Sequence, residues 1–239
     1  PYNQVPVLDE HTACVIVEPV AANMGLVPPV DGFLEGLRAE CDRVGALLIF
    51  DEVITGFRVA RGGAQSLAGV VPDLTTFGKV IGGGLNIGAY GGRRSVMAQV
   101  APIGPVYQAG TLSGNPLATA AGLAALELLD DAAYAQLTAT AGRLAGHLQD
   151  ALTSARIPSV VSQQHSLVGI HFGYAAPIDY PTAQETKTAA YAAFFHAMLQ
   201  RGVALAPGAY EVLFPGLAHT DGLVDAIGAD ALTDWAEFA

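Results

Sequence analysis

The chain has few lysines, few cysteines and no long apolar run, and each shortage excludes a class of protein. Its 239 residues include two lysines, and 22 acidic side chains outnumber 11 basic ones. Nucleic-acid binding is therefore not expected, because phosphate contacts need clustered lysine and arginine. Apolar residues make up 51% of the chain, yet no uninterrupted run approaches the ~20 residues that span a membrane. We expect one large domain or two smaller ones, with no membrane contact.

The two cysteines have no CxxC partner and no neighbouring histidine of the kind that binds metal. We expect both Cys14 and Cys41 to be buried or partly buried reduced thiols, which favours the cytoplasm. The six histidines show no metal-like spacing either, so no metal site is expected. The first residues, PYNQVPVLDEHT, have no basic or apolar leader region, so no signal peptide is expected. The missing initiator methionine favours a fragment of a longer protein.

The first half of the chain has the pattern of a strand, a helix and a second strand. Residues 13–20, ACVIVEPV, form a β-branched run typical of a buried strand. Apolar residues then recur at helical spacing up to Val44, with Asp31 as the expected N-cap and Gly45 as the helix stop. Residues 46–50 are a second apolar strand. These elements predict a βαβ unit, hence an α/β fold with a mainly parallel sheet.

The second half of the chain changes character. We expect a short strand and many turns within residues 70–92, then a helix from Asn115 to about Leu152 with a break near residues 130–131. Four further elements are expected: a strand at 166–172, a helix at 182–200, a short strand at 203–206 and a mostly helical stretch at 217–239. These features predict two parts, residues 1–140 and 141–239.

An aspartate ends the second apolar strand. Asp51 stands in ALLIFDEVITGFR, and the carboxyl edge of a parallel sheet is where α/β proteins bind ligands. A carboxylate there could cap or pair with a neighbouring element, or it could face a bound cation. A protonated pyridinium is such a cation, and a charge-assisted hydrogen bond would keep its nitrogen protonated.

A lysine follows this aspartate after 28 residues, in PDLTTFGKVIGGGLNIGAYGGR. Most lysines are solvated surface charges, but Lys79 has apolar flanks and three nearby glycines that let a backbone approach a ligand closely. An amine in such a site can act as a nucleophile. Asp51 and Lys79 are therefore the pair that a pyridoxal-phosphate enzyme needs, one for the ring nitrogen and one for the aldehyde.

Two other segments are candidates for ligand contact. Residues 107–116, YQAGTLSGNP, precede the long helix, where small hydroxyl residues and free N–H groups suit a phosphate. Ordinary capping of that helix by Ser113 or Asn115 would explain the same residues. Asn23 follows the first strand, at the edge where Asp51 is expected, and could either reach a ligand or close a turn.

Together these segments resemble the glutamate-1-semialdehyde 2,1-aminomutases, within the class III aminotransferases. The resemblance is nearly continuous from about Val15 to Leu129, is most specific at DEVITGFR, GGAQ and VYQAGTLSGNP, and returns weakly at GVALAPGAYEVLFPGLAHT. It implies the type I pyridoxal-phosphate-dependent transferase fold. Residues 1–140 would be the C-terminal portion of the cofactor-binding large domain, and residues 141–239 an α+β small domain. Family members are nearly twice as long, so an N-terminal half would be missing.

The resemblance implies a role for each matching residue. Lys79 matches the Schiff-base lysine, which is also the general acid and base. Asp51 matches the partner of the pyridinium nitrogen, and Val53 the residue that packs on the ring face. Asn23 matches an asparagine near the ring hydroxyl. The cofactor would be pyridoxal 5′-phosphate, which alternates with its pyridoxamine form.

The resemblance also implies a homodimer with a shared active site. Gly110 and Thr111 match the turn that reaches the cofactor phosphate of the neighbouring subunit. Glu211 matches a glutamate on the substrate side, although the family usually continues with alanine and glycine where this chain has Val212 and Leu213.

The reaction implied is the isomerisation of (S)-4-amino-5-oxopentanoate to 5-aminolevulinate for tetrapyrrole synthesis, through a diamino intermediate. Two alternatives remain open from the sequence. One is a class III transaminase with a separate amino donor and keto acceptor. The other is a truncated chain that is inactive or pairs with another polypeptide.

Overall fold

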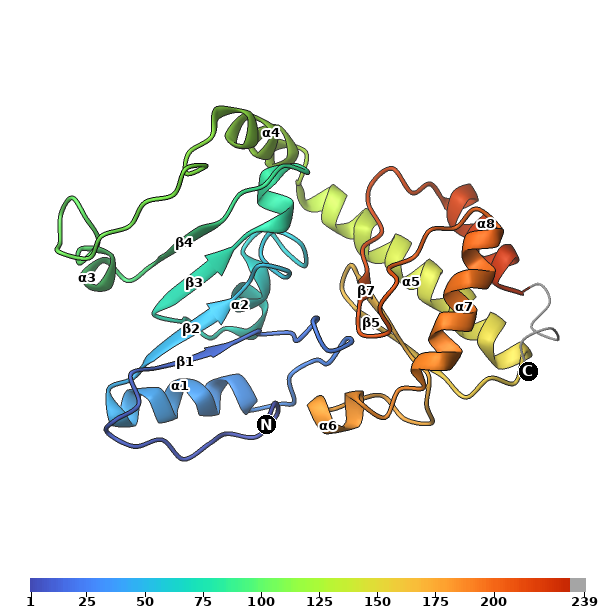
Figure 1. Cartoon of the computed structure of the whole chain (residues 1–239), viewed down its shortest axis with the longest axis horizontal. Coiled ribbons are helices and arrows are strands. Elements are labelled where there is room, and N and C mark those ends of the chain that lie inside the picture. The colour runs from blue at the N-terminus through green and yellow to red at the C-terminus, as the bar shows by residue number, and fades with distance from the viewer. Residues whose placement is uncertain (233–239) are drawn as a thin grey trace. The chain divides into compact units, whose positions relative to one another are not determined.

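The computed structural model describes residues 1–232 and contains two compact units (Figure 1). The first unit comprises residues 1, 3–20 and 29–130, and the second comprises residues 2, 21–28 and 131 onward. The division falls at the start of helix α5 (Asp131–Ser154), ten residues before the expected boundary at residue 140. The assignment of these parts to the domains of a larger enzyme stays a prediction.

The first unit is built on a four-stranded sheet in the order β1-β2-β3-β4. Strands β1, β2 and β3 are parallel, whereas β4 pairs with β3 in the antiparallel direction, so the expectation of a mainly parallel sheet is confirmed. Residues 70–92 thus hold two strands, where one was expected. The strands are β1 (Cys14–Val17), β2 (Leu47–Asp51), β3 (Leu74–Phe77) and β4 (Ala89–Gly92).

Helix α1 (Phe33–Val44) connects β1 to β2 and contacts both strands (Figure 1). It buries one apolar stripe, which includes Phe33, Leu37 and Cys41. The helix ends as expected at Gly45, which is left-handed and donates its N–H to Cys41. The expected cap by Asp31 is wrong, because the left-handed Gly32 occupies the cap position and no side chain caps the helix.

The two cysteines differ in exposure, and both thiols are free. Cys41 is buried on α1, and burial raises the pKa of its thiol. Cys14 is exposed, so the expectation of a buried or partly buried thiol is wrong there. The reason is that Cys14 begins β1, which lies at the edge of the sheet and alternates between exposed and half-buried residues.

The remaining helices of the first unit follow β2, β3 and β4 along the chain. The 3-10 helix η1 packs against α4, and glycines permit the close approach. A Cβ on Gly122 would lie 2.0 Å from the Ile81 carbonyl oxygen, and one on Gly83 would lie 2.3 Å from that of Ala121. These elements are α2 (Gly63–Ala68), η1 (Lys79–Gly82), α3 (Arg94–Met97) and α4 (Pro116–Glu127). The expected helix break at residues 130–131 is confirmed, since it separates α4 from α5.

The second unit packs α5 and α8 together beside a three-stranded antiparallel sheet in the order β5-β6-β7. Its core gathers fully buried side chains that include Leu148, Leu152 and Phe194. None of the helices within residues 1–232 is long and apolar enough to cross a membrane. The elements are β5 (Val160–Gln164), β6 (Leu167–His171), α6 (Tyr180–Ala183), α7 (Thr188–Gln200), β7 (Val212–Leu213) and α8 (Asp221–Leu232).

Several expectations for the second unit need correction. No strand forms at 203–206, because the partner of β6 is β7, at 212–213. The expected helix at 182–200 is divided into α6 and α7. Strand β5 was not expected, since its half-polar sequence VVSQQ lacks an apolar pattern. The mostly helical stretch expected at 217–239 is confirmed as α8 over residues 221–232. Residues 233–239 of that expected stretch lie outside the described residues.

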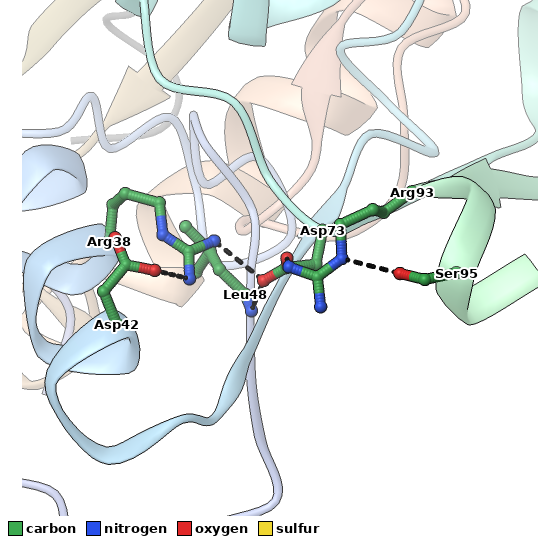
Figure 2. A network of polar contacts seen from close by, with 6 residues as sticks. All are labelled: Arg38, Asp42, Leu48, Asp73, Arg93 and Ser95. Carbon is green, nitrogen blue, oxygen red and sulfur yellow. Dashed lines mark hydrogen bonds and ion pairs between the residues drawn. The ribbon is translucent and has the colours of Figure 1, made fainter.

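A buried carboxylate ties the amino ends of β2 and β3 to α1 and to the end of β4 (Figure 2). Asp73, just before β3, accepts hydrogen bonds from Arg38 Nη1 at 2.8 Å and from the Leu48 N–H at 2.9 Å. Arg93 Nη1 lies 2.8 Å from its other oxygen. Burial acts to raise the pKa of Asp73, but the Leu48 N–H and the two arginines outweigh it and hold the pKa below its usual value.

We expect the D73N variant to lose about 3 kcal/mol of unfolding free energy at pH 7, because the two arginines would lose a buried partner. A carboxyl whose pKa is lowered in the folded state stabilises the fold at pH values above the pKa that it has in the unfolded chain. The difference between wild type and D73N should therefore shrink as the pH falls below about 4. Urea unfolding followed by circular dichroism at several pH values measures this.

The matched control is D42N. Asp42 also pairs with Arg38, at 2.6 Å, but its side chain is 67% exposed, so its loss should cost at most about 1 kcal/mol. Equal losses for D73N and D42N would contradict the structural role of Asp73.

Candidate functional site

The carboxylate of Asp51 is held through one of its two oxygens. Asp51 is the last residue of β2 and pairs in register with Thr76 of β3. Its Oδ1 accepts a hydrogen bond from the Val53 N–H at 3.0 Å and another from Thr76 Oγ1 at 3.2 Å. Within residues 1–232, no described hydrogen bond or ion pair engages Oδ2. The half-buried side chain is thus oriented and still has one oxygen available for a ligand.

Lys79 lies just beyond the end of β3, at the same carboxyl edge of the sheet as Asp51. It is exposed and begins η1 with a left-handed backbone, φ +48°. A residue other than glycine is strained in that backbone conformation. Such strain recurs at functional positions. The structure therefore places both residues of the expected pair at one edge of the sheet.

Val53 lies two residues after Asp51, and its side chain packs against the backbone that leads to Lys79. A Cβ placed on Gly78 would lie 3.2 Å from Val53 Cγ1. Val53 is half-buried and offers an apolar surface next to both polar groups. A carboxylate, an apolar side chain and an amine at one edge of the sheet suit a flat cationic ring with a reactive aldehyde.

Glu52, the neighbour of Asp51, is fully buried and organises the loop that follows β2. Its carboxylate accepts four hydrogen bonds from neutral groups: Thr55 Oγ1 at 2.9 Å, the Ala64 N–H at 2.6 Å, the Gln65 N–H at 3.1 Å and Gln65 Nε2 at 3.0 Å. Gly63 has φ +67°, and a Cβ there would lie 2.2 Å from Glu52 Oε2. The GGAQ segment, residues 62–65, therefore closes over this carboxylate.

Glu52 was not among the site residues expected from the sequence. The available signal was an acidic residue directly after an apolar strand, followed by the GGAQ segment. A charge in such a position must find partners if it is buried. The hydrogen bonds of Glu52 hold both ends of the loop that carries Val53.

The TGFR segment packs against the end of β3. The rings of Phe57 and Phe77 lie 5.7 Å apart, and a Cβ on Gly56 would lie 2.6 Å from Phe77 Cδ1. Burial lowers the pKa of Arg58 to about 10, which still leaves its guanidinium charged at neutral pH. This packing supports the strand end that leads to Lys79.

Gly110 and Thr111 lie on an exposed turn in front of α4. The turn is closed by the Ser113 N–H, which donates to the Gly110 carbonyl at 3.0 Å. Asn115 is the cap of α4, because its Oδ1 accepts the N–H groups of residues 117 and 118. Among residues 1–232, no described hydrogen bond joins Gly110 or Thr111 to the Asp51–Lys79 edge. Their contact with a neighbouring subunit stays a prediction.

Asn23 and Glu211 belong to the second unit, whereas the candidates above belong to the first. Asn23 is exposed within a turn that is closed by two hydrogen bonds between Ala21 and Val27. Gly25, two residues after Asn23, donates its N–H at 2.7 Å to the carbonyl of Tyr210, beside Glu211. The structure thus places the Asn23 and Glu211 segments side by side.

Glu211 is exposed, and its charge acts on a buried tyrosine of α7. Burial, and secondarily the charge of Glu211, raises the pKa of Tyr191 to about 12. In the described part of the chain, no group of three or more His, Cys, Asp or Glu side chains gathers in a way that could hold a metal ion.

A comparison with protein-family models matches residues 3–228 to the class-III aminotransferases. A curated relative, "Glutamate-1-semialdehyde 2,1-aminomutase" of Syntrophobacter fumaroxidans, is 57% identical over 212 residues. The match covers 88% of this chain and 49% of that protein. The expected resemblance is therefore confirmed, and the chain spans about half the length of the curated relatives that it matches.

Solved structures give the same result for the fold. An omega-transaminase from Sphaerobacter thermophilus aligns with a TM-score of 0.82 and 34% identity, covering 92% of this chain and 52% of its own. A glutamate-1-semialdehyde-aminomutase (K286A) from Pseudomonas aeruginosa PAO1, in complex with PMP, aligns with a TM-score of 0.81 and 27% identity, covering 92% and 51%. The predicted type I transferase fold is confirmed.

We expect the E52A variant to lose about 3 kcal/mol of unfolding free energy, because it leaves several buried donors around residues 55–65 without an acceptor. Urea unfolding followed by circular dichroism measures the loss. E127A removes an exposed glutamate from α4 and should change stability by less than about 0.5 kcal/mol. If E52A were as mild as E127A, Glu52 would not hold the loop.

Proposed function

Because this chain belongs to the class-III aminotransferase family, we propose that it carries the lysine and aspartate of a pyridoxal-phosphate-dependent aminomutase. The proposed reaction converts (S)-4-amino-5-oxopentanoate, a small-molecule substrate, to 5-aminolevulinate for tetrapyrrole synthesis. The observation that carries the proposal is the position of Asp51 and Lys79 at one sheet edge, with one Asp51 oxygen already held by the protein. The likeness to curated aminomutases supports the choice of reaction.

The residues present fit pyridoxal 5′-phosphate. Asp51 Oδ2 is an acceptor for a protonated ring nitrogen, and the apolar Val53 side chain offers a packing surface for the ring. Lys79 supplies an exposed amine that can bond to the aldehyde. When bound, the cofactor supplies an electron sink for charge that develops on the substrate carbon.

The chain's own groups then divide the remaining work. The Asp51 carboxylate would keep the ring nitrogen protonated, and Lys79 Nζ would act as general acid and base by carrying a proton between the substrate carbon and the cofactor carbon. We assign Asn23 to the ring hydroxyl and Glu211 to the substrate side. The adjacency of the Asn23 and Glu211 segments within the second unit supports their common role.

We further propose a homodimer in which Gly110 and Thr111 bind the cofactor phosphate of the neighbouring subunit. The exposed hydroxyl and backbone groups of this turn support that role. Large apolar side chains are exposed on both sides of the turn, and a subunit contact would bury them: Ile103, Val106, Tyr107, Leu112, Leu117 and Leu123. The two free thiols support a reducing compartment, the cytoplasm.

A transaminase with a separate amino donor and keto acceptor is a second candidate. It is favoured by the likeness to an omega-transaminase structure. Amino-group balance separates the two functions, since an aminomutase consumes no keto acid. Consumption of one keto acid for each turnover would favour the transaminase.

We expect K79A in the full-length protein to lower the turnover of glutamate 1-semialdehyde by about 100-fold or more, because it removes the proton-transfer group. K187A changes the other lysine of the chain, which is exposed near α7, and should stay within about twofold of wild type. Borohydride reduction of the loaded protein should attach the cofactor to the peptide that contains Lys79.

Normal turnover by K79A would contradict the assignment of Lys79. Attachment of the cofactor to Lys187 would contradict it equally. A wild-type protein that neither binds the cofactor nor turns over substrate would favour the non-catalytic alternative.

A further inference from the structure

The side chains of two consecutive threonines of β3, Thr75 and Thr76, lie on opposite faces of the sheet beside the candidate site. Thr76 Oγ1 donates to Asp51 Oδ1 at 3.2 Å. Thr75 Oγ1 accepts from Gln65 Nε2 at 3.4 Å, and the same Gln65 nitrogen donates to Glu52 at 3.0 Å. Side chains alternate along a strand, so Asp51 and Thr76 share one face while Glu52 and Thr75 share the other.

We propose that Thr76 is a positioning residue that determines which oxygen of Asp51 meets the cofactor nitrogen. This inference rests on the proposed function. Thr76 Oγ1 and the Val53 N–H both donate to Oδ1, at 3.2 Å and 3.0 Å. Two donors on one oxygen leave Oδ2 as the acceptor that faces a ring N–H.

The physical need for a second donor comes from the aspartate torsion that rotates the carboxylate plane. That torsion has broad minima, so a single donor leaves the plane free to turn. Thr76 is β-branched and half-buried on a paired strand, which restricts its own torsion. The Thr76 hydroxyl can therefore fix the orientation of the Asp51 carboxylate plane.

The chain offers a matched set of variants for this proposal. T76V removes the hydroxyl and keeps the branched shape, while T76S keeps the hydroxyl. T75V makes the same chemical change one residue earlier, on the face that contacts Gln65. A general effect of hydroxyl loss in β3 would appear in both valine variants, whereas a positioning effect would appear in T76V alone.

Cofactor affinity and the protonation of the ring nitrogen are the two measurements. We expect T76V in the full-length protein to bind pyridoxal 5′-phosphate about two- to tenfold more weakly, as the net contribution of one ordinary hydrogen bond predicts. With ¹⁵N-labelled cofactor, the ring-nitrogen resonance should move toward the unprotonated position in T76V. T75V should match wild type in both measurements, and T76S should restore most of the affinity.

Three outcomes would overturn the inference. One is a T76V protein with wild-type affinity and an unchanged ¹⁵N resonance, and another is an equal change in T75V. In both cases the proposed function stands if borohydride still attaches the cofactor to Lys79. The third is a wild-type protein that does not bind the cofactor, which would overturn the proposed function together with this inference.

Discussion

The parallel pairing of β2 with β3 is the constraint on which the candidate site depends. Its register places Phe50 opposite Thr75 and Asp51 opposite Thr76. Because side chains alternate along a strand, a slip by one residue would turn every side chain of one strand to the other face. The carboxylate of Asp51 would then lose Thr76, and the strand end that leads to Lys79 would shift along the edge.

Two buried carboxylates flank this pairing, one at each end of the strands. Asp73, at the amino end, forms ion pairs with two arginines and accepts a hydrogen bond from the N–H of Leu48 in β2. Glu52, at the carboxyl end, accepts hydrogen bonds from neutral groups of its own loop. The first joins strands, and the second closes the loop that presents Val53. The chemistry assigned to Asp51 therefore depends on neighbours that do not themselves meet a ligand.

Local patterns predicted the first half of the fold well, and their failures have physical reasons. The β1-α1-β2 unit and the stop at Gly45 followed from apolar spacing and from glycine. The expected N-cap at Asp31 failed because the backbone of Gly32 is left-handed. In the second unit, the apolar run at 203–206 formed no strand, since pairing with β6 selected residues 212–213. Strand formation there was determined by the partner and not by local propensity.

The sequence by itself determined the kind of site that we propose, because Asp51 and Lys79 have functional groups suited to one cofactor and stand in segments typical of one family. The tertiary structure decided how those groups are held. Glu52 and Thr76 acquired their roles only there, because a hydrogen bond between residues distant in the chain requires a particular register and a closed loop. Residue type follows from the chain itself, whereas the orientation of a carboxylate depends on the neighbours that folding brings to it.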